Sequence, residues 1–263
     1  MNSYRYQDQT ALITGASSGI GEAYARELAS RGCHVILTAR SKTKLEALAS
    51  ELTRVHGVQA HALPCDLSQA GAPRMLAESI SELGLPVNIL INNAAFGTYG
   101  RFEEIDSGRE QEEIMLNTSA LVELTHLYLP GMLKRKEGVV VNVASMAAFA
   151  PCAYMAVYGA TKAFVLSFSE ALWAETRGRG VRVMALCPGA TDTGFFDEVG
   201  SRDMVKGNAL STPQRVVQAG FRGIDKGRSY IIDGRSNQFA ALVSQLLPRR
   251  SLALANERIS RPK

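Results

Sequence analysis

A tyrosine and a lysine one helical turn apart form the pair of side chains with the clearest chemistry. Tyr158 and Lys162 are spaced i, i+4 in a helical stretch, so both project from one helix face. A free phenol has a pKa near about 10, and a neighbouring ammonium favours the phenolate and lowers that pKa. Such a tyrosine can donate a proton to a ketone oxygen or remove one from an alcohol. Ser145, which follows an apolar run, can hydrogen-bond the same oxygen.

Tyrosine and lysine at this spacing also occur on ordinary exposed helices. In this chain, however, a glycine-rich turn favours the catalytic interpretation. Residues 14–21 read T-G-A-S-S-G-I-G, with an apolar run at 10–14 before them and helical apolar spacing after them. Glycine permits tight turning and close approach of a ligand to the backbone. The N–H groups at a helix start then bind an anion, so this turn suits a pyrophosphate, although its spacing is G-x-x-x-G-x-G rather than the commoner G-x-G-x-x-G.

The elements that must position these groups alternate along the chain. We expect apolar strands at 10–14, 34–38, 59–63, 88–91, 139–143, 181–186 and 229–232. Helical patterns fill the intervals, including a helix at 108–129 that breaks near Pro130-Gly131 and another at 155–177. Continuously apolar strands that alternate with helices indicate a parallel sheet covered on both faces. We therefore predict an α/β fold, with residues 1–263 forming one doubly wound domain.

Ligands bind such sheets outside the carboxyl ends of the strands. Polar or glycine-containing segments follow successive strands here, and we expect them to line one crevice beside Tyr158 and Lys162. These segments are residues 15–21, Arg40, Asp66-Leu67, Asn92-Asn93, Ser145 and Pro188-Gly189.

The order and spacing of these motifs resemble the short-chain dehydrogenase/reductase family over nearly the whole chain. The matching pieces are Thr14-Gly15-x-x-x-Gly19-x-Gly21, Asn92-Asn93-Ala94, Asn117, Ser145, Tyr158-x-x-x-Lys162, and Pro188-Gly189 with Thr193. The resemblance implies a Rossmann-like sheet of seven parallel strands and hydride transfer at the nicotinamide C4. One departure is Ala95, where the family's N-N-A-G motif has glycine, and we expect its methyl group to tighten the turn without altering the chemistry.

The resemblance also implies the roles of four catalytic residues. Tyr158 would be the acid and base, and Lys162 would hold the nicotinamide ribose and lower the tyrosine pKa. Ser145 would orient the carbonyl, and Asn117 would hold a water that links Lys162 to solvent.

The choice of cofactor depends on the end of the second strand. An acidic residue there would bond the ribose hydroxyls and repel a 2′-phosphate, but this chain has Ala39 followed by Arg40. A guanidinium pairs with phosphate in a forked geometry, and Ser17 can add a hydrogen bond. We therefore expect NADP(H) as the cofactor and carbonyl reduction as the reaction, although Arg40 also fits a plain surface position. The expected cofactor contacts are Gly15, Ser17, Ser18, Gly19, Ile20, Gly21, Arg40, Asp66, Leu67, Asn93, Ala94, Tyr158, Lys162, Pro188, Gly189, Thr191 and Thr193.

The substrate is less constrained by the sequence. Apolar side chains near the expected crevice suggest a ketone or aldehyde with apolar substituents, and each of them also fits an ordinary core position. They are Phe96, Tyr99, Phe102, Met146, Phe149, Tyr154, Phe195 and Phe196. The irregular stretch at 191–212 is expected to form a substrate lid.

Composition excludes several other classes of protein. The net charge is +4, and residues 248–263 alone carry five Lys or Arg against Glu257, so the rest of the chain is neutral and a nucleic-acid surface is not expected. We expect this basic tail to be solvated or to contact a subunit, with an anionic membrane surface as the alternative. No apolar run is long enough to cross a bilayer and the N-terminus lacks a signal-peptide pattern. The four cysteines and four histidines lack metal-ligand spacing, so we expect no metal, free thiols and a cytoplasmic location.

Two other functions remain open at this stage. The first is a regulator or scaffold that binds NADP(H) without turnover, which the complete catalytic set disfavours. The second is a sugar-nucleotide epimerase, for which the chain is short. By resemblance we also expect a homodimer or homotetramer that pairs through the long helices at 108–129 and 155–177.

Overall fold

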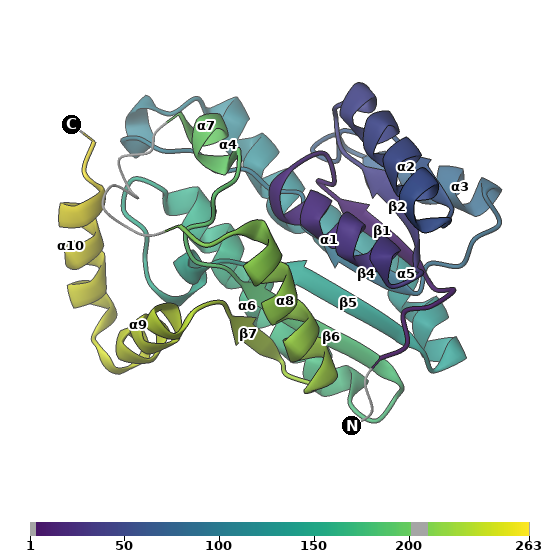
Figure 1. Ribbon diagram of the computed structural model, residues 1–263. Coiled ribbons are helices and arrows are strands. Elements are labelled where there is room, and N and C mark those ends of the chain that lie inside the picture. Colours follow the sequence, from purple (N-terminus) through teal and green to yellow (C-terminus); the bar gives the residue numbers. More distant parts are fainter. Residues whose placement is uncertain (1–3, 201–209, 263) are drawn as a thin grey trace.

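The computed structural model describes residues 4–200 and 210–262, and it contains a seven-stranded parallel sheet (Figure 1). The strand order is β3-β2-β1-β4-β5-β6-β7, so the expected doubly wound sheet is confirmed. Its strands are β1 (Thr10–Thr14), β2 (His34–Thr38), β3 (Ala60–Ala62), β4 (Ile89–Asn92), β5 (Gly138–Val143), β6 (Val181–Cys187) and β7 (Tyr230–Ile232). The strand order reverses direction between β1 and β4, and this switch point is where open parallel sheets bind ligands.

Helices cover both faces of the sheet. They are α1 (Gly19–Ser30), α2 (Lys42–His56), α3 (Ala72–Glu82), α4 (Ser107–Ile114), α5 (Leu121–Arg135), α6 (Ala156–Thr176), α7 (Phe195–Val199), α8 (Pro213–Asp225), α9 (Arg235–Leu246) and α10 (Arg249–Ser260). Short 3₁₀ turns occur at η1 (Phe102–Glu104) and η3 (Met146–Phe149), and a π-helical segment, η2 (Met115–Ala120), joins α4 to α5. Helices α1, α2 and α8 pack on one face, where Figure 1 shows them in front, and α3, α5 and α6 pack on the other.

Burial on both faces explains the continuously apolar strands. In β1, Ala11 and Ile13 belong to the core beneath α1 and α8, whereas Leu12 between them belongs to the core beneath α3 and α5. Successive strand side chains point to opposite faces, so a doubly covered strand needs an apolar residue at every position.

The helix expected to break near Pro130-Gly131 instead continues to Arg135, so that expectation was wrong. Pro130 lies inside α5 on a solvent-exposed face of the helix, and His126, one turn earlier, is exposed on the same face. Proline cannot donate a hydrogen bond to the carbonyl of residue 126, but solvent can satisfy that carbonyl on an exposed face. The helix therefore tolerates the proline near its end.

Most of the basic segment that was expected to be a C-terminal tail forms helix α10 in the structure. The hydroxyl of Tyr99 donates to Ser260 O at 2.9 Å and that of Tyr154 donates to Glu257 Oε1 at 3.1 Å, while Asn256 Nδ2 donates to Pro151 O at 2.7 Å. These bonds fix α10 against the loops beside the sheet's carboxyl edge. Lys263 lies outside the described residues.

The expected lid falls partly within the described residues. It contains the short helix α7, and Thr191 and Ser211 form an isolated parallel bridge at its base. Its central part, 201–209, lies outside the described residues.

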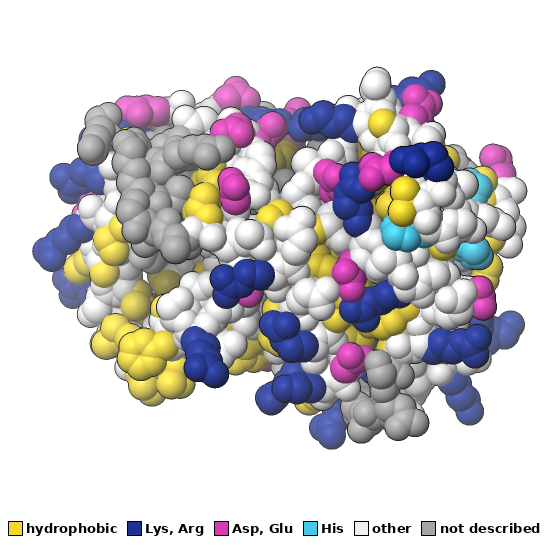
Figure 2. Space-filling view, viewed as in Figure 1, with side chains coloured by type: hydrophobic (Ala, Val, Ile, Leu, Met, Phe, Trp, Pro, Cys, Tyr) yellow, Lys and Arg dark blue, Asp and Glu magenta, His cyan; other side chains and the backbone are white. Residues whose placement is uncertain are grey.

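The surface carries an apolar patch over α9, where Figure 2 shows hydrophobic side chains gathered at the lower left. Phe239, Leu242 and Leu246 of this helix are all exposed. Within residues 4–200 and 210–262, no helix combines the length and the apolar character that a membrane crossing requires.

Candidate active site

A cavity of about 940 Å³ opens at the carboxyl ends of the strands. Its size falls within the range typical of ligand sites. Nearly all the expected cofactor contacts line it, together with Ser145, which is expected to be catalytic. These lining residues are Gly15, Ser17, Ser18, Gly19, Ile20, Arg40, Asp66, Leu67, Asn93, Ala94, Tyr158, Lys162, Pro188, Gly189, Thr191 and Thr193. Two expected site residues do not line it: Gly21 lies in the first turn of α1, and Asn117 is buried on η2.

The glycine turn is shaped by contacts that only glycine permits. Gly15 has φ +66° and Gly19 has φ +58°, a region that side chains disfavour. A Cβ on Gly21 would lie 2.2 Å from Gly15 O, so the start of α1 reaches the end of β1 only without that side chain. Ser18, at the N-cap of α1, makes no capping hydrogen bond with its side chain. The first N–H groups of this helix therefore suit a pyrophosphate, and the turn fits a dinucleotide.

The Asn92-Asn93-Ala94 segment braces this turn. Asn93 Nδ2 donates to Thr14 O at 2.9 Å, and Thr14 Oγ1 accepts from the backbone N–H groups of Asn93 and Ala94, both at 2.9 Å. These bonds join the carboxyl ends of β1 and β4 at the switch point. The amide of Asn93 therefore stabilises the glycine turn in addition to lining the cavity.

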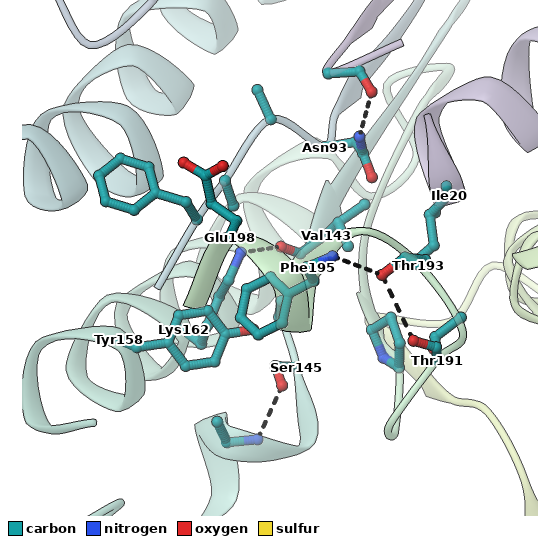
Figure 3. A pocket seen from close by; sticks show the side chains of 18 of the residues that line it. Ile20, Asn93, Val143, Ser145, Tyr158, Lys162, Thr191, Thr193, Phe195 and Glu198 are labelled. Carbon is teal, nitrogen blue, oxygen red and sulfur yellow. Dashed lines mark hydrogen bonds between the residues drawn. The ribbon is translucent and has the colours of Figure 1, made fainter. Parts of the chain in front are cut away.

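Tyr158, Lys162 and Ser145 lie together at the inner end of the cavity (Figure 3). Lys162 Nζ donates to Val143 O at 2.9 Å, and its ammonium lies 5.7 Å from the ring centroid of Tyr158. Ser145 caps η3 by accepting from Ala147 N at 3.1 Å, and its side chain lies near enough to Tyr158 to lower the pKa of that phenol. The three side chains expected to act on the carbonyl thus lie close together.

The pKa of Tyr158 is shifted in the direction opposite to the one expected from the sequence. Burial raises the pKa of its phenol above the ordinary value, and the nearby Ser145 side chain, which lowers it, only partly offsets this. Burial also lowers the pKa of Lys162 to about 8, against the attraction of Glu113, which raises it. At neutral pH the phenol therefore keeps a proton that it can donate, and the neighbouring lysine is still mostly charged.

Comparison with known proteins places this geometry in a family. The family model described as short chain dehydrogenase matches residues 9–203. The chain belongs to the short-chain dehydrogenase family.

Two curated relatives and one solved structure show how far the similarity of this short-chain dehydrogenase extends. It is 36% identical over 183 residues to a very-long-chain 3-oxoacyl-CoA reductase of Anas platyrhynchos, a match that covers 68% of this chain but only 58% of that protein. It is 33% identical to the ketoacyl reductase HetN of a Nostoc strain, over 85% of this chain and 78% of that one. A short-chain dehydrogenase from Sphingobium yanoikuyae in complex with NADPH has a TM-score of 0.82 and 33% identity, and the match covers 97% and 98% of the two chains.

Asn117 of this dehydrogenase makes its contacts from the π-helical segment. Its Nδ2 donates to Phe96 O at 2.9 Å and to Thr161 Oγ1 at 3.1 Å, and its Oδ1 accepts from Phe96 N at 3.2 Å. The side chain thus ties the loop after β4 to helix α6, and its role in holding a water stays a prediction. Periodicity could not reveal η2, because the extra residue in a π turn depends on these tertiary bonds.

Arg40 lines the cavity as expected, but its guanidinium already has an anionic neighbour. Arg40 Nη2 lies 3.4 Å from Glu198 Oε1 of helix α7, and Arg109 of α4 donates to the same oxygen at 2.5 Å. The carboxylate of Glu198 therefore bridges the end of β2 and the start of α4 across the cavity mouth. Sequence reasoning identified neither Glu198 nor Arg109, because their pairing depends on how α7 folds over the sheet.

The loop from Pro188 to α7 carries the remaining expected contacts. Thr191 Oγ1 donates to Gly189 O at 2.9 Å, and Thr193 Oγ1 accepts from Phe195 N at 3.3 Å (Figure 3). These bonds place the ring of Phe195 5.2 Å from that of Tyr158, centroid to centroid. Helix α7 of the expected lid thus lies against Tyr158.

Five of the eight expected substrate contacts line the cavity: Phe96, Met146, Phe149, Phe195 and Phe196. The other three were assigned wrongly. The hydroxyls of Tyr99 and Tyr154 bond helix α10, and Phe102 is 64% exposed on η1. In their place α9 and α10 supply cavity residues that the sequence reading missed, namely Ala240, Ser244, Leu252, Ala255 and Asn256. The spacing of Leu252, Ala255 and Asn256 on one helical face was the available signal.

Proposed function

We propose that this dehydrogenase reduces a ketone or aldehyde with apolar substituents, using NADPH. The observation that carries the proposal is the presence of a neutral, half-buried Tyr158 and of Arg40 in the lining of one cavity. The end of β2 presents Ala39 and Arg40 where a carboxylate would repel a 2′-phosphate. The NADPH complex of the Sphingobium relative supports the same choice of cofactor.

At the reacting end the chain's own residues would act as follows. The hydroxyl of Ser145 orients the carbonyl oxygen of the substrate, and the phenol of Tyr158 donates a proton to it. Lys162 holds the nicotinamide ribose, and its bond to Val143 O fixes the ammonium near the tyrosine ring. Bound NADPH would supply the hydride to the carbonyl carbon.

The substrate end of the cavity favours an apolar molecule. Met146 and Phe149 of η3, Phe195 and Phe196 of the lid, and Leu252 of α10 surround the space beyond Tyr158. Burial of apolar substrate surface against such walls stabilises the complex by about 25 cal/mol per Å². The name of the Anas platyrhynchos relative, a very-long-chain 3-oxoacyl-CoA reductase, supports a ketone with a long apolar chain.

Two measurements test the proposal. NADPH consumption is followed with a panel of long-chain 3-oxoacyl thioesters, steroid ketones and aromatic ketones, with Tyr158→Phe as the control that removes the proton donor. Activity of the wild type that this variant lacks is the expected result. The absence of turnover across the panel, in protein that binds NADPH, would instead identify a regulator.

The cofactor choice is tested separately through Arg40. Dissociation constants for NADPH and NADH are measured by nucleotide fluorescence in the wild type and in Arg40→Ala. We expect the variant to lose about 10-fold or more in NADPH affinity and little in NADH affinity, because a charge-assisted phosphate contact contributes about 1.5–3 kcal/mol. An unchanged preference for NADPH would refute the role of Arg40.

We also propose that the subunits pair through α5 and α6. Phe164 is 45% exposed on α6 and stacks on Phe168, and Leu127 of α5 is 38% exposed. Large apolar side chains on neighbouring long helices suit a subunit contact. Light scattering should give a dimer or tetramer for the wild type and a smaller species for Phe164→Arg.

A further inference from the structure

A buried carboxylate lies beneath the catalytic pair without a part in the proposed reaction. Glu113, on α4, is 0% exposed, one helical turn before Asn117. Its Oε2 accepts two hydrogen bonds from Thr98, from the backbone N at 3.0 Å and from the hydroxyl at 2.8 Å. Its Oε1 is also buried and has no hydrogen-bond partner among the described residues. A buried carboxylate with one oxygen unsatisfied is costly, so its position calls for a reason.

Glu113 and Asn117 together clamp the loop that follows β4. Asn117 bonds both the N–H and the carbonyl of Phe96, and Glu113 bonds Thr98 two residues later. Gly97 lies between the two clamped residues. A Cβ on Gly97 would lie 3.0 Å from Cδ2 of Tyr158 and 3.1 Å from Cζ of Phe195. The loop therefore forms the surface against which the ring of Tyr158 rests.

The carboxylate also acts on the charges of the catalytic pair. Ionised Glu113 raises the pKa of Lys162 by attraction and that of Tyr158 by repulsion. The charged groups that face Glu113 are Lys162 on α6 and Glu110 on its own helix, with the phenol of Tyr158 beyond the clamped loop. Burial raises the pKa of Glu113 to about 7, against the two bonds from Thr98, which lower it. The carboxyl of Glu113 therefore changes between its neutral and ionised forms at pH values near neutrality.

We propose that Glu113 is a positioning residue for the catalytic pair, holding the 96–98 loop against the Tyr158 ring and setting the charge beside Lys162. This inference rests on the proposed roles of Tyr158 and Lys162. The proposed role of Glu113 has two parts. The geometric part, support of the loop, needs a hydrogen-bond acceptor at position 113, and the electrostatic part, the charge beside Lys162, needs an ionisable group there.

Two substitutions separate these parts. In Glu113→Gln the side-chain oxygen still accepts from Thr98, so the loop stays in place and only the ionisation is lost. In Glu113→Ala both are lost. Glu103→Gln removes the same charge from an exposed position on η1 and is the matched control.

The first readout is the pH dependence of kcat/KM for carbonyl reduction. The assay covers pH 5.5 to 8.5, which spans about one and a half units on either side of the Glu113 pKa of about 7. The wild type and Glu103→Gln should show a step of about 3- to 10-fold centred near pH 7, as expected for a unit charge acting over a few ångströms in a partly screened site. Glu113→Gln should lack that step while its affinity for NADPH is unchanged. Glu113→Ala should in addition lose about 10-fold or more in kcat, because the loop no longer supports the tyrosine.

The second readout needs no catalysis. In protein labelled with ¹³C at the glutamate carboxyls, the resonance that Glu113→Gln lacks should titrate with a midpoint near 7. A midpoint near the ordinary glutamate value would overturn the electrostatic part, and coincident pH profiles of the wild type and Glu113→Gln would overturn the proposal while leaving the function intact. Activity retained by Tyr158→Phe would overturn the proposed function, and the inference with it.

Discussion

Arg40 and Glu198 lie 3.4 Å apart, so the guanidinium proposed to bind a 2′-phosphate is already beside a carboxylate. Arg40 follows the end of β2, and Glu198 comes from α7, in the expected lid. Arg109 on α4 binds the same carboxylate, which ties the lid to both sides of the cavity mouth. A dinucleotide phosphate that pairs with Arg40 would therefore compete with Glu198 for its guanidinium.

This relationship predicts that Glu198→Ala binds NADPH more tightly than the wild type. The Arg40 pair is largely exposed, and exposed pairs contribute about 0.2–1 kcal/mol, which corresponds to about a 1.5- to 5-fold lower dissociation constant. The affinity for NADH should change less, because NADH has no phosphate that competes with the carboxylate. Fluorescence titration of both nucleotides measures the difference. Equal changes for the two nucleotides would show that Glu198 acts on the lid as a whole and not on the phosphate site.

The main features of the fold could be predicted because local pattern and tertiary environment agree. The valine run of β5 is buried on both faces, and the i, i+4 spacing of Tyr158 and Lys162 holds on a regular helix. Both features depend on a few neighbouring residues in the sequence. The same holds for the glycines of residues 15–21, whose spacing reflects one local turn.

The features that could not be predicted depend on contacts between distant segments. Helix α10 contains arginines and few large apolar residues, and the bonds from Tyr99 and Tyr154 fix its position. Glu113 stands in an acidic stretch that resembles an exposed helix, yet it is buried in the structure, where it bonds Thr98 of the loop after β4. The raised pKa of Tyr158 likewise depends on the enclosing walls of the cavity rather than on its lysine neighbour.

The packing of the glycine turn predicts a sharp difference between two glycine substitutions. In Gly21→Ala the new Cβ would lie 2.2 Å from Gly15 O, and backbone must move to relieve the overlap. We expect a loss of about 1–3 kcal/mol in the free energy of unfolding and a large loss of NADPH affinity. Gly194→Ala is the matched control, because its Cβ meets nothing within 4 Å and its φ of −66° suits any residue. Urea denaturation should show an effect for Gly21→Ala alone, and equal stabilities would contradict the tight turn.

The direction of the Tyr158 pKa shift predicts different pH profiles for the two directions of the reaction. Because burial raises this pKa, the phenol remains protonated through neutral pH and is available as a proton donor for reduction. Alcohol oxidation needs the phenolate, whose fraction increases about tenfold per pH unit below the pKa. When kcat/KM for oxidation is measured from pH 7 to 9, it should therefore rise steadily, by roughly tenfold per pH unit. A plateau that begins near neutral pH would mean that Lys162 lowers the tyrosine pKa after all.

The pKa of Glu113 predicts how its burial affects stability. The folded state raises this pKa from 4.5 to about 7, so between these values the folded protein binds more protons than the unfolded chain. The contribution of Glu113 to the free energy of unfolding is therefore fully present below pH 4.5 and is lost as the pH rises to about 7. The loss amounts to about 3 kcal/mol, at 1.36 kcal/mol per pKa unit. Glu113→Gln cannot ionise, so the stability of the wild type relative to this variant should fall by about that amount over the interval. Urea denaturation of both proteins at several pH values measures this difference. A constant difference across the interval would show that the carboxyl keeps its ordinary pKa despite its burial.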